Sequence, residues 1–534
     1  MKITVGKSLM IEKPTLEVEG WILSKEIPNP ERESMKKMGL YYFHVPEKLK
    51  LYSYNLYANT YTLPRCLIDN LAKEIDLRSC DIKYNLNEGK KIELGRNTFN
   101  LRDYQTEAIK KAKNGGLLVA PAGSGKTVMG ISLISELKVK TLWLCHSKDL
   151  LNQAVATFKT AHPEEGRDSI GILSEGNYLV SDNNKVVFAL VQTLKRNTEY
   201  INNDKEFGLI IVDEAHHVPS VTFSSIISKS SAKTLIGLTA TPERKDGLTP
   251  MLHAFIGEPS VEIDRAVLYA RNKLVIPKLV TVYTNFESNL AFKSQESSYH
   301  EIVAELYNNF NRAKLVAETI VRYSENGLTI VLCDNINYSF KIKTLVDSIC
   351  KKRTEIIHSG VSQYKTIKCT PSKYNLLKMQ GLEVSEYSKG KTKIKQYSDE
   401  AFEILKCNKK KREDSIELAR KGKIDILFAT KLADEGLDIP NIAVVALISP
   451  SKGDSSGTKN GSSLEQRVGR AMRPYPGKKE AYILDFIDYY SGIFKNQWYS
   501  RRRTYKRLGI EVPKKPKGKG VQTLADKIFD EFEI

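Results

Sequence analysis

The sequence predicts an α/β protein with two tandem parallel-sheet domains, a small α/β domain before them and a basic tail after them. Three observations support this prediction. The chain has 534 residues, which is too long for a single core. From Leu101 onward, continuous apolar runs alternate with amphipathic stretches, which is typical of parallel strands buried on both faces. The last stretch is rich in Lys and Arg. The predicted domains are residues 1–98, 99–265, 275–490 and 491–534.

The first 98 residues contain short apolar and aromatic runs, such as Leu40–Val45 and Leu49–Leu56. Asn-Pro, Glu-rich and turn-forming segments interrupt these runs. Such a pattern predicts a small mixed α/β accessory domain.

The first parallel-sheet domain starts after Leu101. Apolar residues recur at helical spacing over Lys126–Leu137, which predicts a helix. Continuous apolar runs predict strands at Leu117–Ala120, Thr141–Cys145, Val186–Val191, Leu209–Val212 and Leu235–Leu238.

A second alternating unit begins near Pro277. Its expected strands are Thr329–Cys333, Ile424–Ala429, Val444–Ile448 and Ala481–Leu484. A Lys- and Tyr-rich insertion at about 361–411 interrupts the alternation. After about Trp498 the chain becomes basic and rich in Pro and Gly, and we expect it to be partly disordered.

The net charge of +19 predicts a polyanionic partner, with nucleic acid ahead of a membrane surface. The charge is concentrated in two segments. Residues 361–412 hold thirteen Lys and Arg against five acids, and residues 501–520 hold nine against one. In the insertion, Tyr364, Tyr374, Tyr387 and Tyr397 stand among lysines. This segment either stacks bases and binds the backbone or is a solvated, functionally neutral insertion.

The cysteines and the apolar runs predict where the protein resides. The seven cysteines are scattered without a CxxC pair, which argues against structural zinc or an iron–sulfur cluster and suits a reducing compartment. The longest apolar runs are too short to span a bilayer, and no signal sequence opens the chain. We therefore expect a soluble, cytoplasmic protein without a membrane partner, encoded by either a virus or its host.

A phosphate-binding loop follows the predicted strand at 117–120. Gly123 and Gly125 let the backbone approach a phosphate, so that successive N–H groups can face it. Lys126 would reach the β and γ oxygens of ATP, and the Thr127 hydroxyl would bind Mg²⁺. The loop comprises Ala120, Pro121, Ala122, Gly123, Ser124, Gly125, Lys126 and Thr127.

Two carboxylates follow the predicted strand at 209–212, at the end where parallel sheets bind ligands. Asp213 would hold Mg²⁺, and Glu214 would orient and deprotonate the attacking water. His216 and His217 are adjacent and do not share a face, so we expect them to couple this motif to its neighbours rather than to bind a metal.

Two further segments are candidates for the first half of the site. Thr239 and Thr241 end a core strand and would hydrogen-bond the carboxylate motif and relay nucleotide state. Arg102 and Gln105 precede the phosphate loop, and Gln105 either reads the adenine edge or belongs to a solvated helix start.

The second unit contributes a turn and a basic helix. Gly436 permits a tight turn, and Asp438 would meet the ribose or the water network. Gln466, Arg470 and Arg473 lie on a predicted helix, where both arginines share one face. These arginines either neutralise charge on the γ-phosphate or form a solvated basic face, and the other motifs favour the first role.

The ordered set of motifs over residues 99–490 resembles a superfamily 2 helicase of the DEAH type, most like the XPB-related and phage UvsW-like DNA helicases and translocases. The resemblance implies two RecA-like domains whose two half-sites close around one ATP with Mg²⁺. It departs from the XPB pattern at Arg244-Lys-Asp246, where Lys245 replaces an acid. The motifs are Leu101–Gln105, Ala120–Thr127, Leu144–Gln153, Val191–Thr193, Asp213–His216, Thr239–Thr241, Ala429–Pro440 and Gln466–Arg473.

The resemblance also implies a function and a set of nucleic-acid contacts. It implies an ATP-dependent DNA helicase or translocase that moves 3′ to 5′ and remodels duplex or branched DNA. An RNA helicase, or an ATP-gated nucleic-acid-binding subunit of a restriction or defence complex, are the alternatives. The residues implied to contact the nucleic acid are His146, Lys148, Gln192, Thr193, Arg244 and Thr430.

Overall fold

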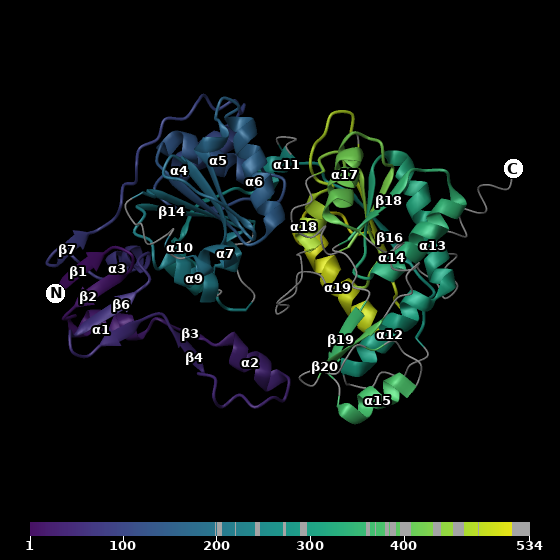
Figure 1. The fold of residues 1–534 in the computed structure, drawn as a ribbon, viewed down its shortest axis with the longest axis horizontal. Helices are drawn as coiled ribbons and strands as arrows, with labels where there is room; N and C mark the ends of the chain where they lie inside the picture. Colours follow the sequence, from purple (N-terminus) through teal and green to yellow (C-terminus); the bar gives the residue numbers. More distant parts are fainter. Residues whose placement is uncertain are drawn as a thin grey trace. The chain divides into compact units, whose positions relative to one another are not determined.

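The computed structural model divides the chain into two compact units, the first ending at Leu274 and the second starting at Val275 (Figure 1). No helix within the described ranges is long and apolar enough to cross a membrane. The described residues are 1–197, 199, 206–218, 221–240, 246–270, 274–288, 296–358, 364–368, 370–379, 384, 391–395, 407–430, 439–451, 464–478 and 480–514.

The first unit opens with a five-stranded mixed sheet of order β5-β6-β2-β1-β7. Its buried core includes Ile3, Leu9, Ile11 and Leu71, which confirms the mixed α/β character expected for this segment. The run Leu40–Val45 is not part of this sheet. The elements are β1 (Lys2–Val5), β2 (Leu9–Glu12), α1 (Leu16–Leu23), β5 (Ser53–Asn55), β6 (Thr60–Leu63), α3 (Leu67–Glu74) and β7 (Asp81–Tyr84).

The N-terminal sheet is anchored to the α/β domain that follows it. The buried Arg65 guanidinium donates to the carbonyl oxygens of Ser230 at 3.4 Å and Ala232 at 2.6 Å. Leu248 and Ala254, which lie just before and within α10 (Thr249–Ile256), belong to the same apolar cluster as the N-terminal core. The two sheets of the first unit are therefore tied by both hydrogen bonds and apolar packing.

The first α/β domain contains an eight-stranded sheet of order β11-β10-β12-β9-β13-β14-β8-β15, in which only the β10–β11 pair is antiparallel. Figure 1 shows α4, α5 and α6 on one side of it and α7, α9 and α10 on the other. Every predicted strand is present, and the helix predicted at Lys126–Leu137 has these bounds. The elements are α4 (Asp103–Ala112), β8 (Gly116–Val119), α5 (Lys126–Leu137), β9 (Thr141–Cys145), α6 (Lys148–Ala161), β10 (Ile170–Ser174), β11 (Asn177–Leu179), β12 (Val186–Leu190), α7 (Val191–Arg196), β13 (Leu209–Asp213), α9 (Val221–Ile227), β14 (Thr234–Thr239), β15 (Pro259–Glu262) and α11 (Arg265–Ala270).

The second unit contains a six-stranded, wholly parallel sheet of order β16-β23-β22-β17-β21-β18. All four predicted strands are present. The predicted fold of two tandem parallel-sheet domains is therefore confirmed. The elements are β16 (Lys278–Tyr283), α12 (Glu296–Asn308), α13 (Phe310–Tyr323), β17 (Thr329–Leu332), α14 (Ile336–Ile349), β18 (Thr354–Ile357), α17 (Lys409–Arg420), β21 (Ile426–Ala429), β22 (Val444–Leu447), α18 (Leu464–Gly469), β23 (Tyr482–Ile487) and α19 (Gly492–Arg507).

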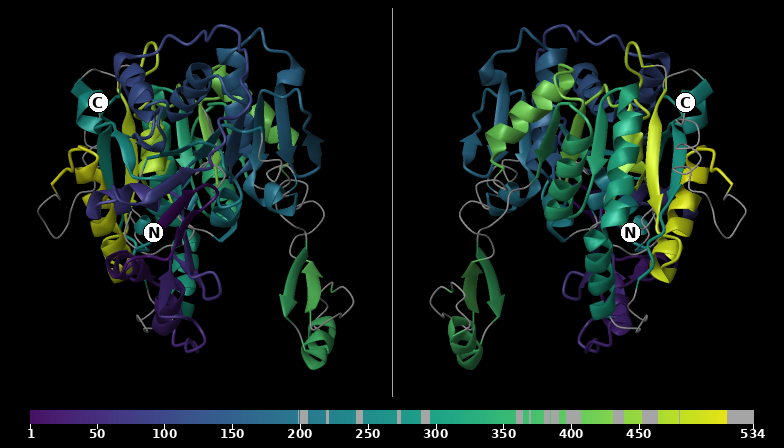
Figure 2. Two further views of the ribbon diagram at one scale, coloured as in Figure 1. Left: turned by 90° about the vertical axis from the view of Figure 1, so that its left-hand side faces the viewer. Right: turned by 90° about the vertical axis from the view of Figure 1, so that its right-hand side faces the viewer.

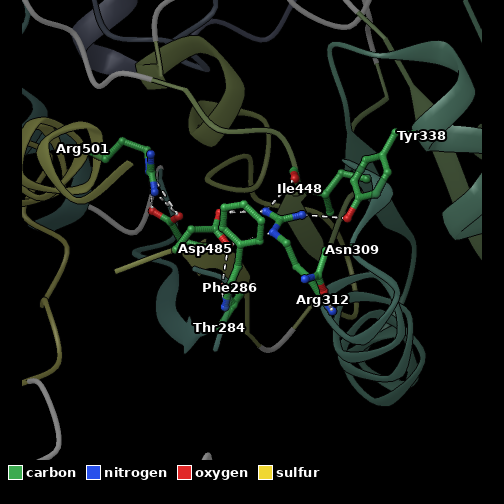
Figure 3. Close-up of polar contacts among 9 residues, drawn as sticks. Thr284, Phe286, Asn309, Arg312, Tyr338, Ile448, Asp485 and Arg501 are labelled. Carbon is green, nitrogen blue, oxygen red and sulfur yellow. Dashed lines mark hydrogen bonds and ion pairs between the residues drawn. The ribbon is translucent and has the colours of Figure 1, made fainter. Parts of the chain in front are cut away.

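Buried ion pairs connect β23 to the helices around it (Figure 3). Just after β23, Asp488 accepts hydrogen bonds from Arg312 Nε at 2.8 Å and from Thr284 Oγ1 at 2.5 Å. Arg312 also donates to the Tyr338 hydroxyl at 2.6 Å and to the Ile448 carbonyl at 3.1 Å. Since both charges are buried, each stabilises the fold only while its partner is present.

The basic chain after about Trp498, which we expected to be partly disordered, is helical as far as Arg507. Helix α19 continues to that residue and buries Trp498, Arg501, Thr504 and Tyr505. Arg501 pairs with Asp485 of β23, its Nε lying 2.8 Å from Oδ2 (Figure 3). The high charge of the segment predicted a solvated chain, so the buried face of α19 could not be predicted from composition. Residues 515–534 lie outside the described part of the chain.

Parts of the predicted insertion form a small substructure of their own. Strands β19 (Tyr364–Lys368) and β20 (Lys391–Lys395) pair antiparallel, and α15 (Pro371–Met379) lies between them in sequence. Figure 2 shows these elements standing apart from the six-stranded sheet. Tyr387 and Tyr397 lie outside the described residues, so the role of the insertion stays a prediction.

Candidate nucleotide site and its couplings

The loop between β8 and α5 has the backbone of an anion-binding site. Gly123 and Gly125 have φ values of +84° and +86°, a region that side chains with a Cβ rarely adopt. Gly125 is the N-cap of α5 and makes no side-chain capping bond, so the first turn of the helix offers its amide groups to a ligand. A Cβ at Gly125 would lie 2.6 Å from Gln105 Nε2. The position therefore requires glycine.

Residues of α4 and the residue before it support this loop. The Tyr104 hydroxyl and Gln105 Nε2 both donate to the Ser124 carbonyl, at 2.8 and 3.0 Å. Gln105 Oε1 accepts from the Arg102 backbone N–H at 3.0 Å, and Arg102 Nη1 donates to Tyr104. Gln105 thus has its oxygen and one amide hydrogen engaged, and it supports the phosphate loop directly. Its proposed contact to adenine stays a prediction.

The loop also carries three side chains that can act as hydrogen-bond donors. Lys126 Nζ lies 3.4 Å from the Ala120 carbonyl, a long contact that a phosphate oxygen would readily replace. The buried Ser124 Oγ finds no hydrogen-bond partner among the described residues. Thr127 is half-buried at the second position of α5. These donors are of the kind that binds a triphosphate, and the Mg²⁺ role of Thr127 stays a prediction.

The carboxylates lie at the same edge of the sheet as the phosphate loop. Strand β14 separates β8 from β13, and the Ala120 N–H donates to the Thr239 carbonyl at 2.9 Å, which fixes the carboxyl ends of β8 and β14 together. Asp213 ends β13 and is buried. Glu214 follows with a φ of +48°, a strained conformation for a residue with a side chain. Strand β13 thus ends at Asp213, and Glu214 is the first residue after it.

The charges of this pair are set by burial and by the surrounding cations. Burial and the neighbouring Glu214 charge raise the pKa of Asp213 above its ordinary value. Burial also acts to raise the pKa of Glu214, but Lys126, His216 and His217 outweigh it and hold that pKa below the ordinary value. An ionised Glu214 can accept a hydrogen bond from water. A divalent cation would offset the cost of burying the Asp213 carboxylate, so Thr127 and Asp213 stay the candidate Mg²⁺ ligands.

Three histidine rings form a continuous row from this motif to the start of α6. His216 Nδ1 lies 3.4 Å from Glu214 Oε2 and 3.4 Å from Thr239 Oγ1. The His216 and His217 rings have centroids 4.3 Å apart, and the His217 and His146 rings have centroids 4.1 Å apart. The structure thus brings together Thr239, His216 and the carboxylates as predicted. The His146 contact was missed, since His146 and His217 are far apart in sequence.

The residues implied to contact nucleic acid differ in exposure. Lys148, the first residue of α6, and Gln192 on α7 are exposed, and His146 is half-buried. The Thr193 hydroxyl is buried and has no partner in the part of the chain that the structure describes, so a phosphate does not reach it in this conformation. Thr430 is also buried. Thr241, Arg244, Gly436 and Asp438 lie outside the described residues.

The predicted helix across Gln466, Arg470 and Arg473 is wrong in its extent. Helix α18 ends at Gly469, and both arginines lie in the turn that follows. Pro474 disfavours helical geometry at the residue before it, and glycine weakens the helix at its end. Arg470 is buried and Arg473 half-buried, so neither belongs to a solvated basic face.

Contacts that the sequence did not suggest hold this arginine turn in place. Arg467 Nη2 lies 3.1 Å from Asp334 Oδ1, and Arg507 of α19 pairs with Glu465 at 3.5 Å. Lys478 Nζ donates to the carbonyl oxygens of Ala471 and Arg473, at 2.5 and 2.9 Å. Burial and the Arg473 charge lower the pKa of Lys478 to about 8.

Comparison with known proteins agrees with this arrangement. Residues 98–244 match the family described as type III restriction enzyme, res subunit, and residues 375–475 match the helicase conserved C-terminal domain. A putative helicase of Sulfolobus islandicus filamentous virus is 26% identical over 73% of this chain and 64% of its own length. This chain therefore spans slightly less than two thirds of that relative.

Two other relatives have more of their length covered. A protein of Sulfurisphaera tokodaii named as a DNA 3′-5′ translocase of the XPB kind is 26% identical over 78% of this chain and 87% of its own length. The solved structure of T4 UvsW covers 95% of this chain and 98% of its own, at 16% identity and a TM-score of 0.36. The two family matches in this order, together with the XPB proteins among the relatives, support a superfamily 2 helicase related to XPB.

Proposed function

We propose that this protein is an ATP-dependent DNA translocase that moves 3′ to 5′ and remodels duplex or branched DNA. One observation carries the proposal. A phosphate loop with Lys126 and the carboxylates Asp213 and Glu214 share one edge of a parallel sheet, and a row of three histidines leads from Glu214 to the start of α6. Nucleotide chemistry and a nucleic-acid contact would then be mechanically linked within one domain.

The residues of the first unit have distinct roles in hydrolysis. The amide groups of the loop and Lys126 bind the phosphates, while Gln105 and Tyr104 keep the loop in shape through the Ser124 carbonyl. Thr127 and Asp213 would hold Mg²⁺, which when bound would supply neutralising charge at the phosphate oxygens. Glu214 orients the attacking water and accepts its proton.

The resemblance also implies a role for the arginine turn of the second unit. Arg470 and Arg473 stabilise charge that develops on the γ-phosphate, and Gln466 orients the same group. The contacts of Arg467, Glu465 and Lys478 hold this turn so that little reorganisation is needed.

The charge of the chain supports a nucleic-acid partner, and one relative supports DNA. The net charge of +19 suits a polyanion, and the Sulfurisphaera relative is named as a DNA translocase. Strand displacement on partial duplexes with opposite single-stranded tails tests the direction. Displacement that depends on a 3′ tail supports the proposal, whereas stimulation by RNA above DNA, or dependence on a 5′ tail, contradicts it.

The match of residues 98–244 to a restriction-enzyme subunit favours a second candidate, an ATP-gated nucleic-acid-binding subunit of a defence complex. A Glu214→Gln variant separates the two functions, since it should bind ATP but not hydrolyse it. Full biological activity of that variant would favour gating, and loss of activity with retained ATP binding favours the translocase.

A further inference from the structure

The N-terminal domain carries an arm that joins the core only at its base, where Ile27 is buried in the core and Leu49 packs against it. The arm comprises β3 (Glu26–Pro28), α2 (Pro30–Lys37), the tip residues 38–45 and β4 (Lys48–Lys50), with β3 and β4 paired antiparallel. Figure 1 shows it extending away from β1, β2 and β6. Helix α2 buries none of its side chains. Helix α2 therefore contributes little to the stability of the domain that bears it.

The tip exposes an unusual concentration of large apolar side chains. Met38, Leu40, Tyr41 and Phe43 are exposed by 64, 51, 71 and 68% of their surface. Four aromatic rings follow one another at residues 41–44. The Tyr42 and Phe43 rings stack with centroids 4.6 Å apart, and the Tyr41 and His44 rings stack at 5.5 Å with planes within 11°. A soluble surface of this kind marks an interaction site.

The backbone of the tip is held in one conformation. Arg32 of α2 donates to the Val45 carbonyl at 2.5 Å, and its guanidinium lies over the Tyr42 ring at 5.2 Å. The Leu40 N–H donates to the Met35 carbonyl and the Val45 N–H to the Tyr42 carbonyl, both at 3.0 Å. The exposed rings are therefore presented by an ordered loop, so binding would require little ordering of the backbone.

The charges on the arm favour a polyanion at the tip. Helix α2 has Glu31 and Glu33 in its first turn and Lys36 and Lys37 in its last, so the lysines adjoin the tip and the acids lie at the far end. Both lysines are exposed. Single-stranded nucleic acid has groups that complement this surface. Its flat base faces can stack on the rings, and its phosphates can pair with the ammonium groups.

We propose that the arm tip binds unpaired bases of a nucleic acid, with Tyr41 and Phe43 as the stacking residues and Lys36 and Lys37 as phosphate contacts. This inference rests on the proposed function and gives it a separate substrate contact. The translocase would then grip the backbone through the α/β domains and recognise single-stranded segments, such as those of a fork or gap, through the arm.

The test compares binding of the full-length protein to labelled oligo(dT) and to an abasic strand of equal length, by fluorescence anisotropy without nucleotide. The double variant Tyr41→Ala/Phe43→Ala should bind oligo(dT) at least about fivefold more weakly than the wild type and bind the abasic strand equally well. Tyr57→Ala is the matched control, since Tyr57 is fully exposed in a loop of the same domain and should leave both affinities unchanged.

The lysines have their own readout. Lys36→Ala/Lys37→Ala should weaken binding to both strands and reduce the slope of log affinity against log salt by about 0.7 for each lost phosphate contact. Two results would overturn the inference: the aromatic variant loses affinity equally for both strands, or its affinity for oligo(dT) is unchanged. A protein partner would then be the remaining candidate for the tip. An oligo(rU) strand in the same assay tells whether RNA is bound equally.

ATPase activity without nucleic acid separates this inference from the proposed function. The tip variants should keep the wild-type basal rate, because the arm shares no residue with the phosphate loop or the carboxylates. Wild-type basal hydrolysis together with unchanged oligo(dT) binding would refute the tip contact alone. Absence of hydrolysis in the wild type even with DNA present would refute the proposed function.

Discussion

Arg501 lies in a basic segment, whose composition predicts a solvated side chain, but the structure buries it. We predict that Arg501→Met destabilises the second unit. Arg501 and Asp485 have side chains exposed by 4 and 1%, and Nε and Nη2 of Arg501 donate to both Asp485 oxygens at 2.8 to 3.1 Å. The substitution leaves a buried carboxylate whose described contact is the Tyr505 hydroxyl.

The expected loss follows from that geometry. Removing one member of a buried ion pair costs about 3–5 kcal/mol, since the remaining charge stays buried without compensation. The double variant Arg501→Met/Asp485→Leu removes both charges and should recover a large part of the loss. Arg503→Met is the matched control, because Arg503 lies on the same helix and is exposed. It should change the free energy of unfolding by less than about 0.5 kcal/mol.

The assay uses the three tryptophans of the chain. Trp21 and Trp143 lie in the first unit and Trp498 in the second, so Trp21→Phe/Trp143→Phe makes fluorescence report on the second unit alone. Urea unfolding in this background should show a lower midpoint for Arg501→Met than for Arg503→Met. Equal midpoints for the two variants would refute a buried role for Arg501 and the packing of α19 with it.

Three further predictions concern the sites themselves. Gly125→Ala should weaken ATP binding by about tenfold or more, because the φ of +86° and the 2.6 Å approach of Gln105 exclude a Cβ, and nucleotide titration measures this. His217→Ala should retain the basal ATPase rate but lose most of its stimulation by DNA, since it breaks the histidine row, and an undiminished stimulation would contradict the coupling. Because the pKa of Lys478 is lowered to about 8 from 10.5, the unfolded chain binds more protons between these values, so the free energy of unfolding should rise with pH there. Lys478→Met should flatten that rise in urea midpoints measured at pH 8 and 9.5.

The sequence was sufficient for the strands of both parallel sheets because they are buried on both faces. Such strands read as continuous apolar runs, as Thr141–Cys145 and Val444–Leu447 do. The phosphate loop was equally predictable from the sequence, because its glycines and Lys126 act through local backbone geometry. Sequence patterns therefore predicted those features that depend on residues close together in the chain.

The contacts that the sequence did not reveal depend on residues far apart in the chain. The histidine row joins His146 to His217, and no periodicity links them. Arg501 is buried in an ion pair with Asp485 of β23. The basic residues around Arg501 in the sequence give no sign of this pair. The end of α18 at Gly469 was missed because the shared face of two arginines suggested a longer helix.

The central claim is that nucleic acid controls ATP hydrolysis at the site built around Glu214. Steady-state ATPase rates without nucleic acid and with single-stranded DNA, duplex DNA, forked DNA or RNA test it most directly. We predict that a DNA substrate raises the rate most and that Glu214→Gln, which keeps the shape but not the charge, lowers every rate by about a hundredfold or more. Equal wild-type rates in all five conditions, or full activity of Glu214→Gln, would contradict the claim.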